Sequence, residues 1–384
     1  MLRFCLAGEY PVDTSRIGGG VLHVMHLLGE TFAERTDIDF HLVGFAKGFD
    51  GVTVVERPGM VFHRIGQPKN RIIPNLLTQA ARIAPILREI KPDVVNSHHC
   101  VSTEAAVLAG CKVVHTVHGV THREVRYLRG KARLATWFHS YVQRKALSKA
   151  DAVISVAQYG LDAYAKWIKG PTGLIGVPVD DVFAEVPPIT PSKGIVFAGG
   201  INRRKNLGAL VRAMPAVVRR HPDAVLHVCG GVLDQRYKDD LDAFVDAEGL
   251  GKSVRFLGVV DRHKLASLLG QSVALALPSY QETAPGVICQ AMAAGRVPVA
   301  SAVGGVPEMI EDGVTGFLVD PDDSEALASR LIRLMDDLDL ARDMGSAARK
   351  VATERYDRHK VADRILEICS SLTTYTETGD RHGV

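Results

Sequence analysis

The sequence predicts an α/β protein with two domains, each built around a doubly wound parallel sheet. Short runs of β-branched and other apolar residues alternate with longer stretches of helical periodicity along the 384 residues, which is typical of repeated βα units. Near the middle, residues 185–192 contain three prolines, which fit neither a helix interior nor a central strand. The length is sufficient for two domains, and we expect two Rossmann-like domains that face each other across a cleft.

The predicted strands form two series, one on each side of the proline-rich segment. Each run is short, apolar and followed in most cases by a helical pattern, as a buried parallel strand requires. The first series comprises residues 2–7, 40–45, 93–97, 112–117 and 152–156, and the second comprises residues 194–198, 224–228, 253–257, 273–277 and 297–300.

The chain after the last predicted strand contains one more helical pattern, over 356–368, and then a polar tail without an apolar period. Together with the strand series, this predicts the following organisation: an N-terminal domain over 1–183, a linker over 184–193, a C-terminal domain over 194–355, a terminal helix over 356–372 and a disordered tail over 373–384.

Composition excludes several classes of protein. Hydrophobic residues make up 46% and charged residues 23%, which is ordinary globular usage and excludes a fibrous or disordered chain. No run of about 18 uncharged apolar residues is present, and no basic segment followed by an apolar one opens the chain. The six cysteines include no C-x-x-C pair. We therefore expect a protein of the reducing cytoplasm.

The net charge of +3 hides an asymmetry between the two halves. Residues 1–180 carry +7 and residues 181–384 carry −4, which predicts an anionic partner or surface for the N-terminal half. The basic residues are concentrated between 123 and 149, where aromatic residues interleave with them; the members of this candidate patch are Arg126, Arg129, Lys131, Arg133 and Trp137. An anionic membrane surface would suit it. The alternative is a solvated helix face, and nucleic acid is disfavoured because no recognition module is present.

A glycine triplet follows the first predicted strand. Gly18, Gly19 and Gly20 precede a helix that begins near Val21. Glycine at a helix N-terminus lets backbone N–H groups approach a phosphate closely. The pattern is not the dinucleotide fingerprint G-x-G-x-x-G, so a plain turn is the alternative.

Histidines stand at the ends of two neighbouring predicted strands. His118 ends the strand that also contains His115, and His98 and His99 end the preceding one. Ligands collect at this edge of open α/β sheets. No carboxylate or cysteine joins these histidines at a familiar ligand spacing, so we expect no metal. His118, followed by glycine, is the functional candidate, and structural roles are the alternative for the other three.

Three cations open the helix after the first strand of the second series. Arg203, Arg204 and Lys205 oppose the dipole of the helix that begins near Leu207. A bound pyrophosphate would explain them, because arginine gives paired hydrogen bonds and lysine a point charge. Solvated surface charge is the alternative.

Residues 278–295 form the most informative segment, PSYQETAPGVICQAMAAG. Together with AVGGVPE over 302–308 and DGVTGFLV over 312–319, it resembles the nucleotide-binding half of retaining glycosyltransferases of the GT-B fold, family 4 (glycosyl transferases group 1). Lys205-Asn206-Leu207 fits this resemblance as well. The resemblance is dense over 194–337 and thinner over 1–180, where Gly19-Gly20, the strand that leads to His98, and Thr116-Val117-His118 match.

The resemblance implies transfer of a sugar from a UDP- or GDP-linked donor to a glycan or lipid-linked acceptor, with retention of configuration. It implies a role in cell-surface polysaccharide or glycolipid biosynthesis, no cofactor and no catalytic metal. The four D-x-D triplets of the chain, a metal-holding pattern in the other large glycosyltransferase fold, do not follow strands in a metal-binding arrangement. It also implies that the terminal helix packs back on the N-terminal domain.

The resemblance assigns roles to individual residues. Glu282 would contact hydroxyls of the donor sugar, and His118 would approach the same sugar. The leaving diphosphate would be stabilised by Lys205, by either Arg203 or Arg204, and by the backbone amides of Gly19 and Gly20, with no enzyme nucleophile. The residues expected to bind the donor are Gly19, Gly20, Arg203, Arg204, Thr283, Ala284, Pro285, Gly286 and Gln290.

Two positions depart from the family pattern. Gln290 stands where a second glutamate usually contacts the ribose, and Gly200 stands where an arginine usually precedes the lysine by five positions. An amide can still exchange hydrogen bonds with ribose hydroxyls. These departures keep open a non-catalytic scaffold subunit that binds nucleotide sugar, and a GT-B epimerase or phosphorylase would use the same site. If the basic patch meets a membrane, the inner face of the cell membrane is the expected place.

Overall fold

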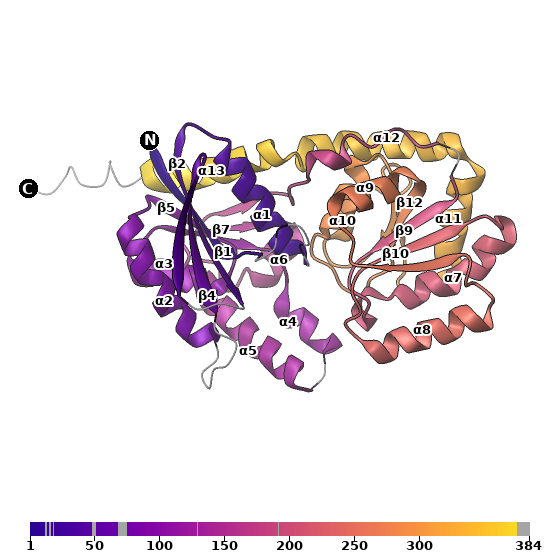
Figure 1. Cartoon of the computed structure of the whole chain (residues 1–384), viewed down its shortest axis with the longest axis horizontal. Coiled ribbons are helices and arrows are strands. Elements are labelled where there is room, and N and C mark those ends of the chain that lie inside the picture. The colour runs from indigo at the N-terminus through magenta and orange to yellow at the C-terminus, as the bar shows by residue number, and fades with distance from the viewer. Residues whose placement is uncertain are drawn as a thin grey trace, which may run out of the picture. The chain divides into compact units, whose positions relative to one another are not determined.

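The structure is a computed structural model that describes residues 1–11, 14, 17, 19–47, 51–67, 75–128, 130–190 and 192–374. The chain divides into two compact units (Figure 1). Unit 1 comprises Met1–Gly176 and Arg358–Val384, and unit 2 comprises Val177–Asp357. Each contains its own sheet and hydrophobic core, so the fold class is α/β with two parallel-sheet domains.

The sheet of unit 1 has the strand order β3-β4-β2-β1-β5-β6-β7-β8. All neighbouring strands are parallel except β3 and β4, which form an antiparallel pair at one edge. The strand bounds are β1 Leu2–Glu9, β2 Ile38–Lys47, β3 Val52–Arg57, β4 Met60–Gln67, β5 Val94–Ser97, β6 Val113–Val117, β7 Ala152–Ser155 and β8 Thr172–Leu174.

Helices cover both faces of this sheet. Helices α2 (Asn75–Ile90), α3 (Cys100–Ala109), α5 (Gly130–Leu147) and α6 (Gln158–Tyr164) contribute to a core with alternate residues of the central strands. On the other face, Phe32 of α1 (Gly20–Ala33) packs edge-on against Phe4 of β1 with 4.8 Å between ring centroids. The alternation of inward and outward side chains along each strand therefore serves two helical layers.

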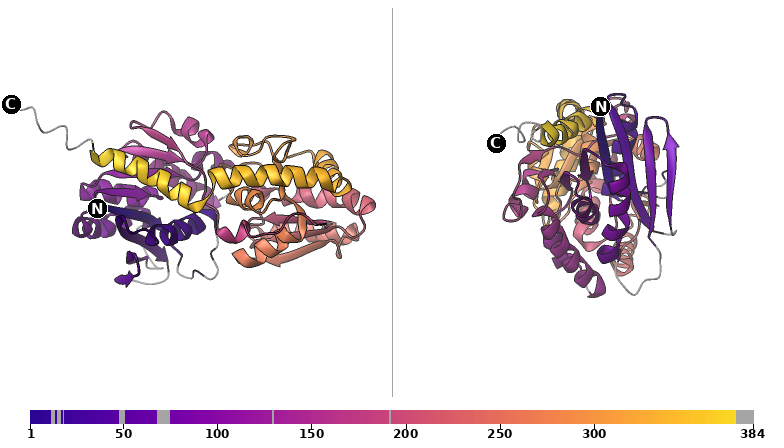
Figure 2. Two further views of the ribbon diagram at one scale, coloured as in Figure 1. Left: turned by 90° about the horizontal axis from the view of Figure 1, so that it is seen from above. Right: turned by 90° about the vertical axis from the view of Figure 1, so that its left-hand side faces the viewer.

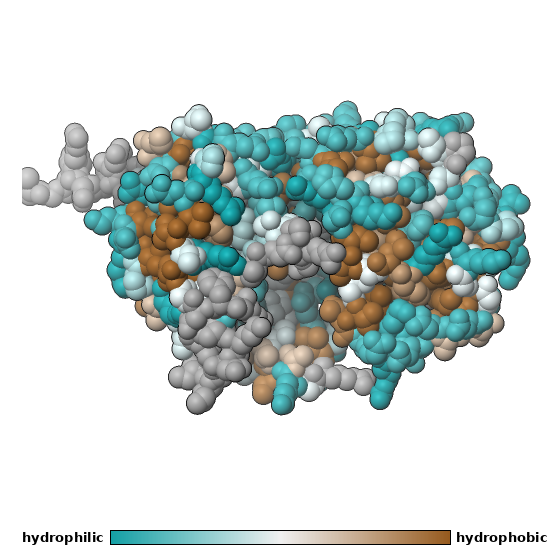
Figure 3. Space-filling model, in the orientation of Figure 1, coloured by the Kyte–Doolittle hydropathy of each residue, from teal (hydrophilic) through white to brown (hydrophobic). Residues whose placement is uncertain are grey.

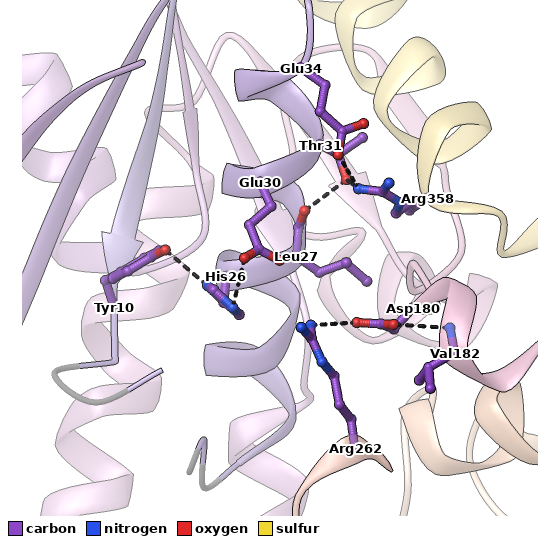
Figure 4. Close-up of polar contacts among 10 residues, drawn as sticks. All are labelled: Tyr10, His26, Leu27, Glu30, Thr31, Glu34, Asp180, Val182, Arg262 and Arg358. Atoms are coloured by element: carbon purple, nitrogen blue, oxygen red, sulfur yellow. Dashed lines mark hydrogen bonds and ion pairs between the residues drawn. The ribbon is translucent and has the colours of Figure 1, made fainter. Parts of the chain in front are cut away.

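The terminal helix α13 (Arg358–Thr374) packs on α1 and β5 of unit 1, and Figure 2 shows it crossing this unit. Arg358 Nη1 donates to Glu34 Oε1 at 2.7 Å and to Thr31 Oγ1 at 3.4 Å (Figure 4). Nearer the start of α1, His26 lies between Tyr10 and Glu30, at 3.1 Å from the Tyr10 hydroxyl and 3.3 Å from the Glu30 carboxylate (Figure 4). Helix α13 includes Thr373 and Thr374, two residues that were expected in the tail; residues 375–384 lie outside the described ones.

The sheet of unit 2 is fully parallel, with the order β11-β10-β9-β12-β13-β14. Helices α7, α8 and α11 lie on one side of it, and α9, α10 and α12 lie on the other (Figure 1). The bounds are β9 Gly194–Ala198, α7 Leu207–Arg220, β10 Val225–Cys229, α8 Gln235–Ala247, β11 Val254–Gly258, α9 Arg262–Gly270, β12 Ser272–Leu277, α10 Gly286–Ala293, β13 Val297–Ser301, β14 Phe317–Val319, α11 Ser324–Asp336 and α12 Leu338–Arg355.

The proline-rich segment lies inside unit 2, and the chain passes between the units at 176/177 and 357/358. Three arginines hold this segment through its carbonyl groups, and one of them, Arg342, donates to the Ile189 carbonyl at 3.2 Å. Arg349 donates to the Val186 carbonyl at 2.5 Å, and the completely buried Arg296 donates to the Pro187 carbonyl at 2.7 Å. Prolines exclude regular structure here but leave the carbonyl oxygens available as acceptors, so the described residues 185–190 form a strip without helix or strand that arginine side chains hold.

The ten predicted strands are all present, with bounds that differ by two residues at most. Four observed strands were not predicted: β3, β4, β8 and β14. Strand β3 is exposed along its whole length and gives no buried apolar run, and β8 and β14, with three residues each, are too short for a pattern. Among the described helices, none is both long enough and apolar enough to cross a membrane.

Candidate functional site

The polar site of unit 2 lies where β9 and β12 end side by side. The chain leaves β9 toward one edge of the sheet and leaves β12 toward the other, so the two loops diverge from a topological switch point. In open α/β sheets, ligands bind at the carboxyl ends of strands at this point. The loop after β9 carries the three cations, and the loop after β12 carries Glu282.

A buried ion cluster joins these two loops. Lys205 Nζ lies 2.6 Å from Glu282 Oε1, and Arg204 Nη1 lies 3.6 Å from Glu282 Oε2. Glu282 is only 6% exposed. Burial raises the pKa of the Glu282 carboxyl, but the charges of Lys205 and Arg204 outweigh burial and hold this pKa below its usual value. The Glu282 carboxyl is therefore ionised at neutral pH.

Local backbone geometry positions the cations. Residues Arg203–Lys205 form a short 3₁₀ turn that the Asn202 side chain caps by accepting the Lys205 N–H at 3.1 Å. Asn206 then adopts a left-handed conformation with φ 48°, which asparagine tolerates better than most residues. This break between the turn and α7 turns Lys205 back along the end of β9, where its side chain lies beside Gly199.

The two arginines point to different partners. Arg204 Nη1 also donates to the Gln281 carbonyl at 2.8 Å, so it belongs to the cluster around Glu282. The side chain of Arg203 is 54% exposed and pairs with Asp240 at 3.4 Å and with Asp234 at 3.8 Å. Of the two arginines that the sequence left as alternatives, Arg204 is the one that lies beside Lys205 and Glu282.

The loop after Glu282 brings further predicted residues to the same edge of the sheet. Pro285 occupies the N-cap position of α10, with Gly286 as the first residue of that helix. The Thr283 hydroxyl and both polar atoms of the Gln281 amide are buried, and they have no hydrogen-bond partner among the described residues. Buried polar groups are normally satisfied, so these atoms indicate a place for a polar ligand. Ala284 is half-buried in the same loop, and Gln290 is half-buried within α10.

The structure gives a physical reason for glycine at position 200. A Cβ atom on Gly200 would lie 2.5 Å from Leu233 Cδ1, so the Leu233 side chain would have to turn aside for a larger residue. Leu233 is 72% exposed, and Val232 and Val259 are exposed near the same ends of β10 and β11. Both units show hydrophobic areas among hydrophilic ones on the face drawn in Figure 3.

The polar site of unit 1 is a hydrogen-bonded chain at the carboxyl ends of β5 and β6. His118 Nε2 lies 2.8 Å from His98 Nδ1, and His98 Nε2 lies 2.7 Å from Asn96 Oδ1. Asn96 Nδ2 donates to the Thr116 hydroxyl at 2.9 Å and to the Val114 carbonyl at 3.3 Å. The predicted pair of neighbouring strand ends therefore brings His98 and His118 into direct contact.

This chain fixes the tautomer of His118. The Val114 carbonyl can only accept, so the Asn96 amide must point its NH₂ group there and its oxygen at His98. His98 Nε2 is then the donor and His98 Nδ1 the acceptor, which makes His118 Nε2 a donor. Burial lowers the pKa of His118 to about 4 and lowers that of His98 strongly. His118 is thus a neutral ring whose Nδ1 lone pair can accept a hydrogen bond from a hydroxyl.

The glycine loop of unit 1 leaves room beside the first helix. Gly19 is the N-cap of α1 with φ 108°, a conformation that glycine adopts at little cost. A Cβ atom added to Gly19 or Gly20 would meet nothing within 4 Å. Among the described residues, no atom therefore fills the space beside Gly19 and Gly20 at the start of α1, and a phosphate site there stays a prediction; Gly18 lies outside the described residues.

His115 and His99 have structural partners. His115 Nδ1 lies 2.7 Å from the Thr103 hydroxyl, and His99 Nδ1 accepts the Val101 N–H at 3.2 Å as the N-cap of α3. Burial lowers the pKa of each to about 3. Both are consistent with the structural alternative that the sequence left open.

The basic patch lies on α5 and on the 3₁₀ turn Val125–Tyr127 before it, with Arg129 outside the described residues. Leu134, Trp137 and Tyr141 are exposed by 70%, 57% and 44%, and their spacing places them on one face of α5. Lys131 and Arg133 are exposed on the same helix, and a hollow of about 280 Å³ is lined by Val125, Gly130, Arg133, Leu134 and Trp137.

Asn96, Asn202, Gln281 and Leu233 belong to these sites and were not predicted. Three of these residues have amide side chains and the fourth is aliphatic, and none belongs to a recognisable sequence motif. Their roles become visible only from the residues that the fold places beside them. A strand-end asparagine two residues before the histidine pair is the one signal that the sequence offered.

Comparison with known proteins matches the two halves of the chain to two glycosyltransferase family models. Residues 180–351 match glycosyl transferases group 1, and residues 17–182 match glycosyltransferase family 4. The α-maltose-1-phosphate synthase of Mycolicibacterium smegmatis is 28% identical over 94% of this chain and 96% of its own length. A D-inositol 3-phosphate glycosyltransferase of Arthrobacter is 27% identical over 86% of this chain and 85% of its own length.

Solved structures with the same fold cover nearly the whole chain. Sucrose-phosphate synthase of Thermosynechococcus elongatus has a TM-score of 0.78 at 23% identity, over 98% of this chain and 100% of its own. Anabaena HepE in complex with UDP and glucose has a TM-score of 0.75 at 20% identity, over 97% and 100%. Both family matches and these folds agree with the resemblance carried by residues 278–319, and the chain therefore belongs to the glycosyltransferases of family 4, group 1, with the GT-B fold.

Proposed function

We propose that this glycosyltransferase moves a sugar from a nucleotide-diphosphate donor to a glycan or lipid-linked acceptor, with retention of configuration and without a catalytic metal. The observation that carries the proposal is the buried cluster of Lys205, Arg204 and Glu282 at the switch point of unit 2. Two cations and one carboxylate leave an excess positive charge in a partly dry site. A diphosphate would neutralise this excess.

The three charged groups divide the work on the donor. Lys205 and Arg204 would bind the diphosphate, and Glu282 would accept hydrogen bonds from hydroxyls of the sugar. Glu282 meanwhile orients both cations, since it already pairs with each of them. As the glycosidic C–O bond breaks, negative charge grows on the leaving diphosphate, and the two fixed cations stabilise it without reorganisation.

Retention follows in this proposal from attack on the face that the diphosphate leaves. The acceptor hydroxyl forms the new bond to the anomeric carbon as the bond to the diphosphate oxygen breaks, and a diphosphate oxygen takes the hydroxyl proton. The products are the glycosylated acceptor and the nucleoside diphosphate. In this step Lys205, Glu282 and His118 bind the donor, and none of them acts as a nucleophile.

His118 and the glycine loop are the contributions of unit 1. A neutral His118 with an accepting Nδ1 suits a sugar hydroxyl better than a phosphate. The open N-terminus of α1 at Gly19 and Gly20 suits the negative charge of the diphosphate. The exposed Val232, Leu233 and Val259 of unit 2 offer an apolar surface for the nucleotide base.

The HepE structures in complex with UDP, and with UDP-glucose, support a nucleotide-sugar donor. The M. smegmatis relative is named as a synthase of a sugar phosphate and the Arthrobacter relative as a transferase to an inositol phosphate. We propose UDP- or GDP-linked donors, and we place a phosphorylated polyol or sugar beside glycans and lipid-linked glycans as acceptors to test.

The exposed face of α5 supports the proposed contact with anionic membrane at the cytoplasmic surface. Leu134, Trp137 and Tyr141 would enter the interface, while Lys131 and Arg133 would meet anionic head groups. Sedimentation with vesicles that contain anionic lipid tests this, with vesicles of neutral lipid as the control. Loss of binding in Trp137→Ser with Leu134→Ser supports the proposal, and equal binding to neutral vesicles contradicts it.

A panel of UDP-, GDP- and ADP-sugars without added metal tests the donor site. We expect one donor to raise the melting temperature and to be hydrolysed slowly, and we expect both effects to be lost in Lys205→Met and Glu282→Gln. Arg203→Ala is the matched control, because Arg203 adjoins the cluster in sequence but pairs with Asp240. If folded protein shows neither a higher melting temperature nor hydrolysis with any donor, the result would favour the non-catalytic scaffold.

Acceptor dependence separates a transferase from an epimerase or phosphorylase that uses the same site. Once the panel has identified the donor, NMR determines the anomeric configuration of the product. A product that keeps the configuration of the donor supports retention, and an inverted product overturns it. Release of sugar 1-phosphate that depends on inorganic phosphate would identify a phosphorylase instead.

A further inference from the structure

A second group of polar side chains lies in unit 1 outside the chain of His118, His98 and Asn96. It joins the start of α3 to the middle of α5 and consists of His99, Cys100 and His139. Cys100 Sγ lies 3.5 Å from His139 Nε2 and 3.9 Å from His99 Nδ1. The three candidate ligand atoms lie within 4.8 Å of one another.

These separations are close to those of ligands around a tetrahedral metal ion. With Zn–S near 2.3 Å and Zn–N near 2.0–2.1 Å, the sulfur and nitrogen ligands of a zinc ion are about 3.6 Å apart. The Cys100–His139 pair already has this separation. His99 and His139 are both half-buried, so small ring rotations can bring the third atom in and an ion can reach the group from solvent.

We propose that His99, Cys100 and His139 bind one zinc ion through a thiolate and two imidazole nitrogens, with the fourth position open to water. The ion would join α3 to α5, the helix that carries the basic patch. On binding, the thiol of Cys100 loses its proton to solvent, and the aqua ion releases all but one of its water ligands as the three protein atoms bind. The site is separate from the donor cluster of unit 2 and has no part in the proposed transfer.

The chemistry of this group fits zinc better than magnesium or calcium. One sulfur and two imidazoles are borderline to soft ligands, and no carboxylate is among them. The cost is the cap of α3, because His99 Nδ1 must exchange the Val101 N–H for the metal.

Linear spacing predicted no metal at these histidines because no cysteine or carboxylate completed a familiar pattern. Cys100 adjoins His99, and His139 comes from a helix 39 residues further along, which no motif connects with the strand end. The fold supplies this third ligand. The alternative arrangement is a metal-free hydrogen bond from the Cys100 thiol to His139.

Metal binding by the full-length protein, stripped with chelator and dialysed, tests the proposal. We expect one Zn²⁺ per chain by elemental analysis, and Co²⁺ should give a thiolate-to-cobalt absorption band together with the strong visible bands of a tetrahedral ion. His139→Gln and Cys100→Ser should weaken Zn²⁺ binding about a hundredfold or more, and Cys100→Ser should abolish the thiolate band.

Cys111→Ser is the matched control, because Cys111 is a free, half-buried cysteine of the same unit outside the group. It should leave stoichiometry and spectrum unchanged. His139→Gln changes a half-buried helix residue, so it keeps the test valid if Cys100→Ser does not fold. The proposal is overturned if the wild-type protein shows no thiolate band, or if both variants bind Zn²⁺ as tightly as the wild type.

Discussion

The two polar sites both lie at the carboxyl ends of parallel strands but differ in their electrostatics. In unit 1, the chain from Asn96 to His118 is neutral, because burial lowers the pKa values of its histidines. In unit 2, Lys205, Arg204 and Glu282 are all charged although Glu282 is buried. The same strand-end geometry therefore supports a network without charge in one domain and an ion cluster in the other.

The difference shows how burial acts on polar groups with and without counter-charges. Burial disfavours a charge in both places, and in unit 1 the histidines respond by staying neutral and pairing with amides and hydroxyls. In unit 2, each charge has an opposite charge within 3.6 Å, so ionisation survives. A neutral network suits hydroxyl groups, whereas an ion cluster with surplus positive charge suits a diphosphate.

The largest expected effect is acid unfolding driven by unit 1. Burial lowers the pKa values of His98, His99, His115 and His118 below 6.5 in the folded protein. The unfolded chain then binds more protons, so stability is complete above about pH 6.5 and falls as pH falls, by about 1.4 kcal/mol per pH unit for each histidine. Urea unfolding from pH 7 to pH 5 measures this slope.

His115→Asn is the matching variant, since His115 contacts Thr103 and has no role in the proposed transfer. It should lower the proton uptake on unfolding at pH 5 by about one. An unfolding free energy that is the same at pH 7 and pH 5 would mean that these histidines are not buried in neutral form.

Removal of the cation at the centre of unit 2 is expected to have the next largest effect. Lys205→Met leaves Glu282 buried with one more distant cation, which should cost about 3 kcal/mol of stability at pH 7. Transfer should fall by about a thousandfold, because a fixed charge no longer stabilises the leaving diphosphate. Calorimetry and initial rates measure the two effects.

The sign of the pH dependence separates this loss from a simple packing defect. The pKa of Glu282 is lowered in the folded protein, so its pairing contributes stability above its usual pKa near 4.5 and loses it as pH falls. The stability difference between wild type and Lys205→Met should therefore shrink as pH approaches 4. An equal difference at pH 7 and pH 4 would attribute it to packing.

His118→Ala is expected to have a smaller effect, confined to turnover. The variant lacks the nitrogen that accepts a hydrogen bond from the sugar hydroxyl. The unpaired hydroxyl should reduce the transfer rate about tenfold to a hundredfold, while nucleoside diphosphate binding stays unchanged. Asn96→Leu should reproduce part of this loss, because His98 then loses the amide oxygen that accepts from its Nε2. The tautomers of His98 and His118 are no longer fixed by this chain. Equal losses of rate and of nucleotide affinity in His118→Ala would place the residue on the diphosphate instead.

The smallest expected effect concerns the pair of Gly200 and Leu233. Gly200→Arg alone should change donor affinity little, because Leu233 takes the space beside it. In combination with Leu233→Ala, the added guanidinium can reach the diphosphate, and donor affinity should rise about tenfold. Isothermal titration with the nucleoside diphosphate measures both variants; an equal rise in the single variant would show that Leu233 does not limit this position.

Buried regular parts of the fold could be predicted from sequence, and exposed or short ones could not. Strand β9 was predicted with its exact bounds because Gly194 and the apolar run after it are buried. Strand β3 was missed since its three valines are mixed with polar residues on a fully exposed edge and form no buried run. Its partner β4 contains His63 and Arg64, which interrupt the apolar run.

The charged part of the site was easier to predict than its neutral part. Lys205 and Glu282 lie in dense motifs, and cations at the start of a helix are conspicuous. Asn96 was missed because its role depends on partners that follow it by 18 and 20 residues. The choice between Arg203 and Arg204 likewise depended on acidic neighbours from α8 that only the fold brings to Arg203.

The hydrogen bonds of Arg296 to the proline-rich segment determine where a fragment of unit 2 should begin. Its guanidinium is completely buried among carbonyl groups, which lowers its pKa to about 10, and Arg349 reaches the same strip. A C-terminal fragment that begins at residue 194 would strip Val186 and Ile189 from their buried places and leave guanidinium donors without acceptors. A fragment over 177–357 keeps the strip, and it is the piece to express for ligand titrations and for limited digestion.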